Sequence, residues 1–159
     1  MKKDREIGIV VYGATGYTGK LVAEYLNKQY GVGGDVSWAM AGRSLEKLEA
    51  VRDDLGIAKE VPLVVADASD PSSIESMVER AAVVLTTVGP YQLYGSDLVA
   101  ACAAAGTDYV DLCGEPTWMK QMIDAHTGAA TASGARIVFS CGFDSIPFDL
   151  GVQFLQQAA

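Results

Sequence analysis

The chain has 159 residues, of which half are hydrophobic and a fifth are charged, so we expect one globular domain with its own core. The net charge of -8 argues against nucleic acid and anionic membranes as partners, although a basic pocket for one small phosphate is compatible with it. No segment approaches the length of a membrane span. The apolar run behind the charged residues 1–6 ends at Gly13, too early for a signal peptide, so we interpret residues 1–6 as the solvated start of the first strand.

The cysteines and the histidine limit the chemistry that the chain can carry. Cys102, Cys113 and Cys141 are odd in number and lack metal-type spacing, which predicts free thiols in a reducing cytoplasm. Cys113 and Cys141 fall at predicted strand ends, where we expect buried small hydrophobes rather than nucleophiles. His126 is the only histidine, so we predict no metal site and no Ser-His-Asp triad.

A glycine-rich turn follows the first predicted strand, residues 7–12. In residues 13–19 (GATGYTG), Gly13 would permit a sharp exit from the strand and Gly16 a close approach of the backbone to a pyrophosphate. Gly19 would let the next helix pack closely on the strand. That helix is indicated by an apolar side at helical spacing, made of Thr18, Leu21, Val22, Tyr25 and Leu26. The context favours a dinucleotide-binding turn, with a purely structural turn as the alternative.

The rest of the chain alternates between short apolar runs and helical segments. After a flexible turn at 30–35, buried strands are predicted at residues 36–41, 62–66, 82–87, 109–112 and 136–140. Ser44 and Asp70 are predicted helix N-caps, the first followed by an apolar side of Leu45, Leu48 and Leu55. Further helices are predicted from Pro71, over 95–105, from Pro116 and over 147–159.

Six strands alternating with helices predict an α/β fold with a parallel sheet covered on both faces. Right-handed crossovers and the position of the glycine turn favour the doubly wound Rossmann-type order 3-2-1-4-5-6. We expect residues 1–146 to form an NAD(P)-binding domain. Residues 147–159 would begin a helix that leads to a C-terminal substrate or dimerisation domain outside this chain.

Ligands of such sheets lie over the carboxyl ends of the strands, and Arg43 and Ser44 close the second strand. An NAD-binding domain would carry a carboxylate near this position for the ribose 2′-hydroxyl. An arginine beside a serine at a helix start suits a 2′-phosphate instead, so we predict NADP rather than NAD. The alternative is a surface arginine next to an N-cap serine.

Other strand ends supply further candidates. Asp67 could accept a hydrogen bond from the adenine amino group or serve only as a turn residue. Gly89 and Pro90 would let the nicotinamide ribose lie against the backbone.

Four residues are candidates for catalysis. Tyr91 could donate a proton, as could Tyr94, although aromatic packing is the alternative for both. Glu115 and Asp144 are the polar candidates near the nicotinamide, with helix capping as the alternative for Glu115. None of the seven tyrosines has a lysine four residues later, which excludes the tyrosine–lysine mechanism of short-chain dehydrogenases.

Several motifs resemble the saccharopine dehydrogenase-like oxidoreductases, and most closely the branch that contains the trans-acting enoyl reductases of mycobacterial lipid synthesis. They are residues 13–19 (GATGYTG), 41–43 (AGR), 88–91 (VGPY), 109–115 (YVDLCGE) and 142–147 (GFDSIP), in the same order along the chain. The resemblance implies an NADP-binding Rossmann domain followed by a catalytic and dimerising domain. The predicted cofactor-binding residues are Gly13, Thr15, Gly16, Tyr17, Thr18, Arg43, Ser44, Asp67, Gly89 and Pro90.

We therefore expect the cofactor domain of an NADP-dependent oxidoreductase that transfers hydride at a C=N, C=C or C=O bond. The substrate would be a small molecule or lipid-linked, and the protein could dimerise through the missing domain. These 159 residues alone should bind cofactor without turnover. The alternative is a non-catalytic NADP-sensing module.

Overall fold

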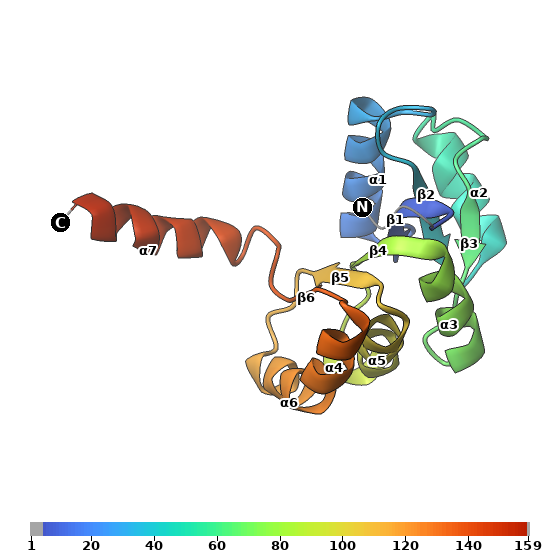
Figure 1. Cartoon of the computed structure of the whole chain (residues 1–159). Helices are drawn as coiled ribbons and strands as arrows, with labels where there is room; N and C mark the ends of the chain where they lie inside the picture. The colour runs from blue at the N-terminus through green and yellow to red at the C-terminus, as the bar shows by residue number, and fades with distance from the viewer. Residues whose placement is uncertain (1–4, 159) are drawn as a thin grey trace.

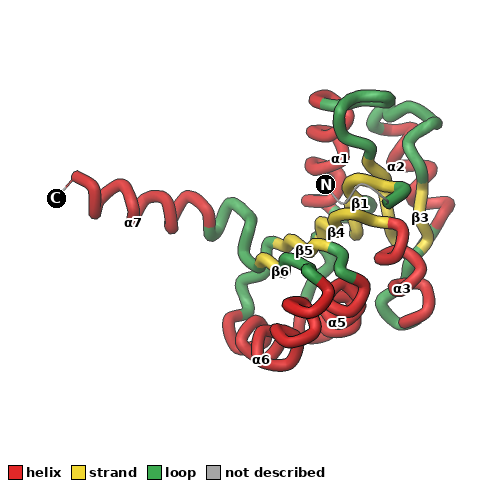
Figure 2. Tube along the Cα trace, viewed as in Figure 1, coloured by secondary structure: helices red, strands yellow, loops and turns green. Residues whose placement is uncertain are grey.

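The computed structural model describes residues 5–158 and places a six-stranded parallel sheet at the centre of the molecule (Figure 1, Figure 2). The observed strand order, β3-β2-β1-β4-β5-β6, confirms the predicted doubly wound Rossmann-type sheet. The strands are β1 (Ile7–Tyr12), β2 (Trp38–Gly42), β3 (Leu63–Val65), β4 (Ala81–Thr86), β5 (Asp108–Asp111) and β6 (Ile137–Val138). Of the predicted solvated start, residues 1–6, the first four lie outside the described residues, as does Ala159.

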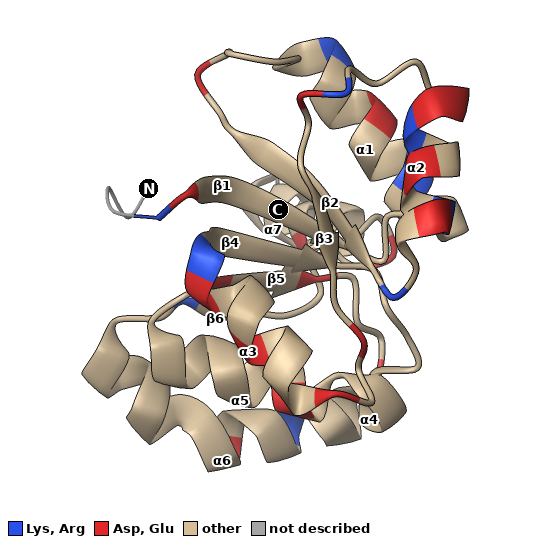
Figure 3. Cartoon of the chain, turned by 90° about the vertical axis from the view of Figure 1, so that its right-hand side faces the viewer, with Lys and Arg blue, Asp and Glu red and all other residues tan. Residues whose placement is uncertain are grey.

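Helices cover both faces of the sheet, as predicted (Figure 3). The helices are α1 (Tyr17–Gln29), α2 (Leu45–Asp54), α3 (Pro71–Arg80), α4 (Tyr91–Tyr94), α5 (Ser96–Ala105), α6 (Pro116–Ser133) and α7 (Ile146–Ala158). Helices α1 and α2 lie on one face, and α3, α5 and α6 on the other. The helices change face at α3, because the chain there crosses from β3 past β1 to β4, and the later strands are added in the opposite direction along the sheet. A right-handed crossover in that direction places its helix on the opposite face.

The core is divided between the two faces by the alternation of side chains along each strand. Val10 of β1 and its neighbour Ala39 of β2 pack toward α3 and α5, whereas Val11 and its neighbour Met40 pack toward α1 and α2. All four side chains are fully buried. A central strand buried on both faces must be apolar throughout, which is why β1 was readable from the sequence.

Local capping sets the starts of α2 and α3, as predicted. The Ser44 hydroxyl accepts a hydrogen bond from the Lys47 N–H at 3.3 Å, and the Asp70 carboxylate accepts one from Ser72 at 3.0 Å. Such caps contribute about 1 kcal/mol each. Leu48 of α2 is fully buried, but Leu45 is exposed, so the predicted apolar side of this helix was wrong at that residue.

The buried side of α1 differs from the prediction. Gly19, Ala23 and Leu26 face the sheet, whereas Leu21 and Tyr25 are 50% and 59% exposed. The reason is the close approach of α1 to the glycine turn: a Cβ on Gly19 would lie 2.0 Å from the Gly13 carbonyl oxygen. Only small residues fit this contact, so larger apolar side chains are turned outward.

Two further differences lie at the carboxyl ends of the strands. The residues after Pro90 form the short helix α4, which was not predicted. β6 is shorter than predicted because Ser140 adopts a left-handed backbone conformation (φ 59°) and its N–H bonds to the Asp111 side chain. Cys141 follows this turn and is exposed, contrary to prediction, while Cys113 is buried.

Helix α7 extends away from the sheet, and none of its described side chains is buried (Figure 1). It begins one residue before the predicted start. Within residues 5–158, no helix combines the length and the apolar character needed to cross a membrane.

Candidate functional site

The glycine turn has the geometry of a tight strand-to-helix connection. The N–H groups of Gly13 and Ala14 both donate to the Ala41 carbonyl, at 2.9 and 3.1 Å, which ties the turn to the end of β2. Gly13 has a φ of 93°, and a Cβ there would lie 2.7 Å from Thr87 Oγ1. Gly13 and Gly19 are thus required by the fold itself.

Gly16 is different. Its backbone is extended (φ -79°, ψ 170°), a conformation open to any residue, and a Cβ would meet only the Gly13 carbonyl oxygen at 3.4 Å. Within residues 5–158, no packing contact excludes a side chain at Gly16. The absence of a Cβ at Gly16 therefore fits a surface that is kept clear for a ligand.

The N-terminus of α1 begins beside Gly16 and carries no side-chain cap among the described residues. Its first turn also holds no acidic residue. The first N–H groups of a helix have no partner within the helix, and the helix dipole adds a partial positive charge there. This end of α1 therefore suits an anion such as a pyrophosphate.

A cavity of about 290 Å³ opens beside the turn, at the carboxyl ends of β1 to β4. The predicted cofactor residues on its wall are Gly13, Thr15, Arg43, Asp67 and Gly89. The catalytic candidate Tyr94 also lines it, and the remaining lining residues are Tyr12, Gly42, Ala68 and Val88. The fold thus brings together residues from four strand ends that are far apart in sequence. Gly42, Ala68 and Tyr12 were not predicted, although each ends or follows a strand.

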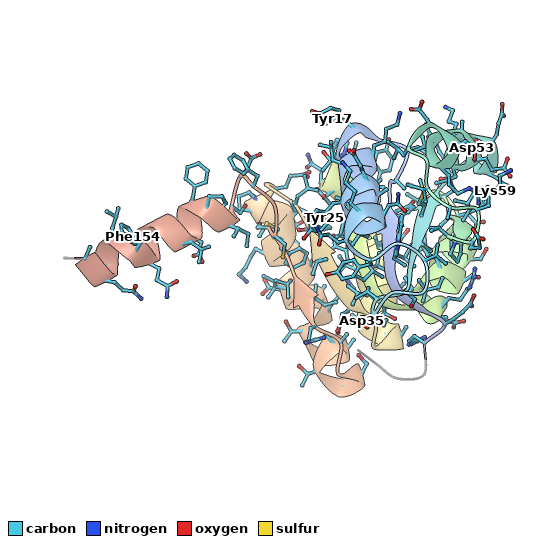
Figure 4. The ribbon with its side chains drawn as sticks, turned by 90° about the horizontal axis from the view of Figure 1, so that it is seen from above. Tyr17, Tyr25, Asp35, Asp53, Lys59 and Phe154 are labelled. Atoms are coloured by element: carbon cyan, nitrogen blue, oxygen red, sulfur yellow. The ribbon has the colours of Figure 1, made fainter. Side chains whose placement is uncertain are left out.

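The other predicted cofactor residues lie outside this cavity. Tyr17 is 83% exposed and projects from the start of α1 into open space (Figure 4). Ser44 caps α2 and Pro90 precedes α4. Thr18 lines a different cavity, of about 320 Å³, with Asp111, Cys141 and Asp144 among its other residues.

Arg43 and Asp67 give the first cavity its charge. The Arg43 side chain is exposed, and no carboxylate of the described residues forms an ion pair with it. Asp67 Oδ1 accepts hydrogen bonds from the N–H and the hydroxyl of Ser69, at 2.9 and 2.8 Å. These bonds, together with the charge of Arg43, lower the pKa of Asp67. Asp67 thus forms a turn through Ser69, and it also lines the cavity, so its hydrogen bond to the adenine amino group stays a prediction.

Tyr12 is a buried member of the cavity wall, as is Gly42. Burial, reinforced by the negative charge of Asp67, raises the pKa of its phenol to about 12. The hydroxyl consequently stays protonated at neutral pH and can act only as a neutral hydrogen-bonding group.

The catalytic candidates do not meet in one site. Tyr91 is buried, its ring lies 5.7 Å from that of Trp118, and its hydroxyl donates to the Thr86 carbonyl at 3.3 Å. Burial also raises the pKa of this phenol. These contacts favour the packing interpretation of Tyr91. Asp144 is exposed beside the cavity that contains Thr18, and Glu115 lines neither cavity.

Glu115 also does not cap the helix that follows it, which corrects the capping interpretation. Its side chain makes no bond to α6. Its two carboxylate oxygens instead accept hydrogen bonds from the N–H groups of Tyr91 and Gln92, at 2.7 and 2.9 Å.

Asp111 is a buried carboxylate that sequence reasoning missed. Its oxygens accept bonds from the N–H groups of Cys113 (3.0 Å) and Ser140 (2.8 Å) and from the hydroxyl of Tyr109 (2.7 Å). Burial nevertheless raises the pKa of Asp111, because desolvation of the carboxylate outweighs these bonds. The signal was a carboxylate directly after the apolar residues Tyr109 and Val110 of a predicted strand. Within residues 5–158, no group of three or more histidine, cysteine or acidic side chains could hold a metal ion.

Comparison with known proteins supplies independent information. Residues 9–138 match the family described as the saccharopine dehydrogenase NADP binding domain. The chain is 56% identical over 149 residues to a trans-acting enoyl reductase of Mycobacterium leprae, covering 93% of this chain and 35% of the relative. It is 53% identical over 156 residues to the trans-acting enoyl reductase of Mycobacterium ulcerans, covering 98% and 37%. The chain thus spans little more than a third of the length of these relatives.

Solved structures agree on the fold. Apo saccharopine dehydrogenase (L-Glu forming) from Saccharomyces cerevisiae superposes with a TM-score of 0.70 at 17% identity, over 95% of this chain and 31% of the other. The triphenylmethane reductase of Citrobacter sp., solved with NADP(H), gives a TM-score of 0.58 at 22% identity, over 83% and 48%. At these identities the likeness establishes the shared fold.

Proposed function

Because the chain belongs to the saccharopine dehydrogenase NADP-binding domain family, we propose that it binds NADP(H) across the carboxyl ends of β1 to β4. The observation that carries this proposal is the cavity in which Gly13, Thr15, Arg43, Asp67 and Gly89 converge beside the uncapped start of α1. A dinucleotide needs donors for its pyrophosphate and a wall that its sugars can approach closely. Both are present at this edge of the sheet.

Each part of the cofactor has a matching group in the chain. The N–H groups at the start of α1 would hold the pyrophosphate, with Gly16 leaving room for it. Arg43 would pair with the 2′-phosphate, since within the described residues its guanidinium forms no ion pair with a carboxylate. Gly89 would allow the nicotinamide ribose to lie against the β4–α4 loop.

When bound, NADPH supplies a hydride, and this domain supplies binding and orientation. We propose that the whole protein is an NADP-dependent oxidoreductase that reduces a carbon–carbon double bond, because its relatives carry the name of enoyl reductases. The comparisons give no support to the alternative of a non-catalytic NADP-sensing module.

The remaining features of the whole protein are proposed on the same basis. Residues 1–146 would be the cofactor domain, and residues 147–159 would lead to a further domain that recognises a small or lipid-linked substrate and forms a homodimer. The apolar, unburied side chains of α7 support this division. The exposed thiol of Cys141 suits a cytoplasmic location, where thiols stay reduced.

The proposal is tested by Gly16→Val in a calorimetric titration with NADPH. The valine side chain should occupy the space proposed for the pyrophosphate and so abolish detectable binding. The fold should survive, because a Cβ at this position meets only the Gly13 carbonyl oxygen, at 3.4 Å. The matched control is Gly128→Val, where a Cβ meets nothing within 4 Å and no cofactor group is proposed. Unchanged NADPH affinity in a well-folded Gly16→Val protein would refute the assignment of the pyrophosphate site.

A further inference from the structure

We infer that Glu115 is a positioning residue, which holds the β4–α4 segment in the place where it forms the nicotinamide side of the cofactor cavity. This inference rests on the proposed function and adds to it a residue that does not itself touch the cavity. Glu115 lies 24 residues beyond Tyr91 in sequence, at the start of a different helix. Its effect on the cavity is therefore exerted across two neighbouring strand ends.

The side chain of Glu115 contacts the start of α4 directly. The Glu115 carboxylate accepts hydrogen bonds from two consecutive N–H groups, those of Tyr91 and Gln92, through separate oxygens. These are the first two residues of α4, whose N–H groups have no partner within the helix. Hydrogen bonds to an ionised acceptor are about twice as strong as neutral ones. The carboxylate therefore fixes the start of α4 at two points.

Residues on both sides of this contact line the cofactor cavity. Val88 and Gly89, just before α4, line the cofactor cavity, and so does Tyr94 at the end of α4. The residues that Glu115 holds lie between them. A displacement of the start of α4 would therefore move this entire wall of the cavity.

The loop that carries Glu115 is itself held by hydrogen bonds. The Glu115 N–H donates to the sulfur of Cys113 at 3.3 Å, and the Cys113 N–H donates to the buried Asp111 carboxylate at 3.0 Å. A parallel link runs from the Leu112 N–H to the Tyr91 hydroxyl at 3.4 Å. The β5–α6 loop is thus anchored to the sheet and transmits that anchoring to α4.

These contacts also argue against a role for Glu115 as a proton acceptor. Both of its oxygens already accept hydrogen bonds from backbone N–H groups, and its side chain does not line the cofactor cavity. The structure assigns it to the support of the cavity wall.

The test compares two ligands, one that would occupy the whole cavity and one that would occupy only its adenosine side. NADPH would use the whole cavity, whereas adenosine 2′,5′-bisphosphate carries the 2′-phosphate but no nicotinamide. The proteins are the wild-type chain, Glu115→Ala, Glu115→Gln and, as a matched loss of one negative charge, Asp97→Ala. Asp97 is an exposed carboxylate in the first turn of α5. Arg43→Ala reports separately on the adenosine side.

We expect Glu115→Ala to weaken NADPH binding about tenfold, or about 1.4 kcal/mol, and to leave adenosine 2′,5′-bisphosphate binding unchanged. The NADPH affinity of Glu115→Gln should lie between those of the wild type and Glu115→Ala, because its amide oxygen can accept one of the two hydrogen bonds. Glu115→Gln also provides the test if Glu115→Ala does not fold. Glu115 variants that bind NADPH as Asp97→Ala does, or that lose both ligands equally, would overturn the inference. If Arg43→Ala has no effect on either ligand, the proposed function itself fails.

Discussion

Replacing Arg43 by alanine should weaken NADPH binding while leaving NADH binding almost unchanged. NADPH differs from NADH only by the 2′-phosphate, and Arg43 is the exposed cation on the wall of the cavity. A hydrogen bond to a charged group contributes about 1.5–3 kcal/mol, which corresponds to roughly a tenfold to a hundredfold change in affinity. The exposure of Arg43 places the expected loss near the lower end of this range.

A second effect of the substitution acts in the same direction. The charge of Arg43 helps to keep the pKa of Asp67 low, and the ionised Asp67 carboxylate faces the same cavity. Without the guanidinium, the 2′-phosphate would meet this negative charge unopposed. Arg43→Asp should therefore weaken NADPH binding more than Arg43→Ala does.

The assay is a fluorescence titration of each protein with NADPH and NADH, at low and at high salt. Higher salt should narrow the preference of the wild type for NADPH, because an exposed charge pair is screened. Lys59→Ala is the matched control, since it removes one exposed positive charge near the end of α2 (Figure 4). Equal affinities of the wild type for NADH and NADPH, or an equal loss of both in Arg43→Ala, would refute the 2′-phosphate assignment.

Three further predictions concern catalysis and stability. Purified chain should oxidise NADPH only at background rate with enoyl, carbonyl or imine substrates, and robust turnover would show that these 159 residues hold a substrate. Gly19→Ala should lower the free energy of unfolding by more than about 2 kcal/mol in chemical denaturation, because its Cβ would lie 2.0 Å from the Gly13 carbonyl oxygen; a near-wild-type midpoint would contradict that packing. The pKa of Asp111 is higher in the folded state than its unfolded value near 3.8. The free energy of unfolding should therefore fall as pH rises from the unfolded-state pKa through the folded-state pKa. Asp111→Asn lacks this decrease, so its stability relative to wild type should increase from about pH 4 upward, and a pH-independent difference would contradict the burial argument.

The strands and their order were predictable because the information is local or topological. β1 is a continuous apolar run, since both of its faces are buried, and Ser44 and Asp70 mark helix starts through bonds to N–H groups two or three residues away. The order of the strands then follows from right-handed crossovers. Arg43 and Gly89 could be assigned to one edge of the sheet for the same reason, because parallel strands place their carboxyl ends together.

The features that the sequence did not reveal depend on contacts between distant segments. Periodicity placed Leu21 and Tyr25 on the buried side of α1, but the close approach of the helix to Gly13 reserves that side for Gly19 and Ala23. Glu115 has the sequence position of a helix cap, yet its carboxylate reaches N–H groups more than 20 residues earlier in the chain. The residues of the chain determine which elements form and in what order they pair. Only the packed tertiary structure decides which side of a helix is buried and which backbone groups a carboxylate can reach, because both depend on the distance between elements.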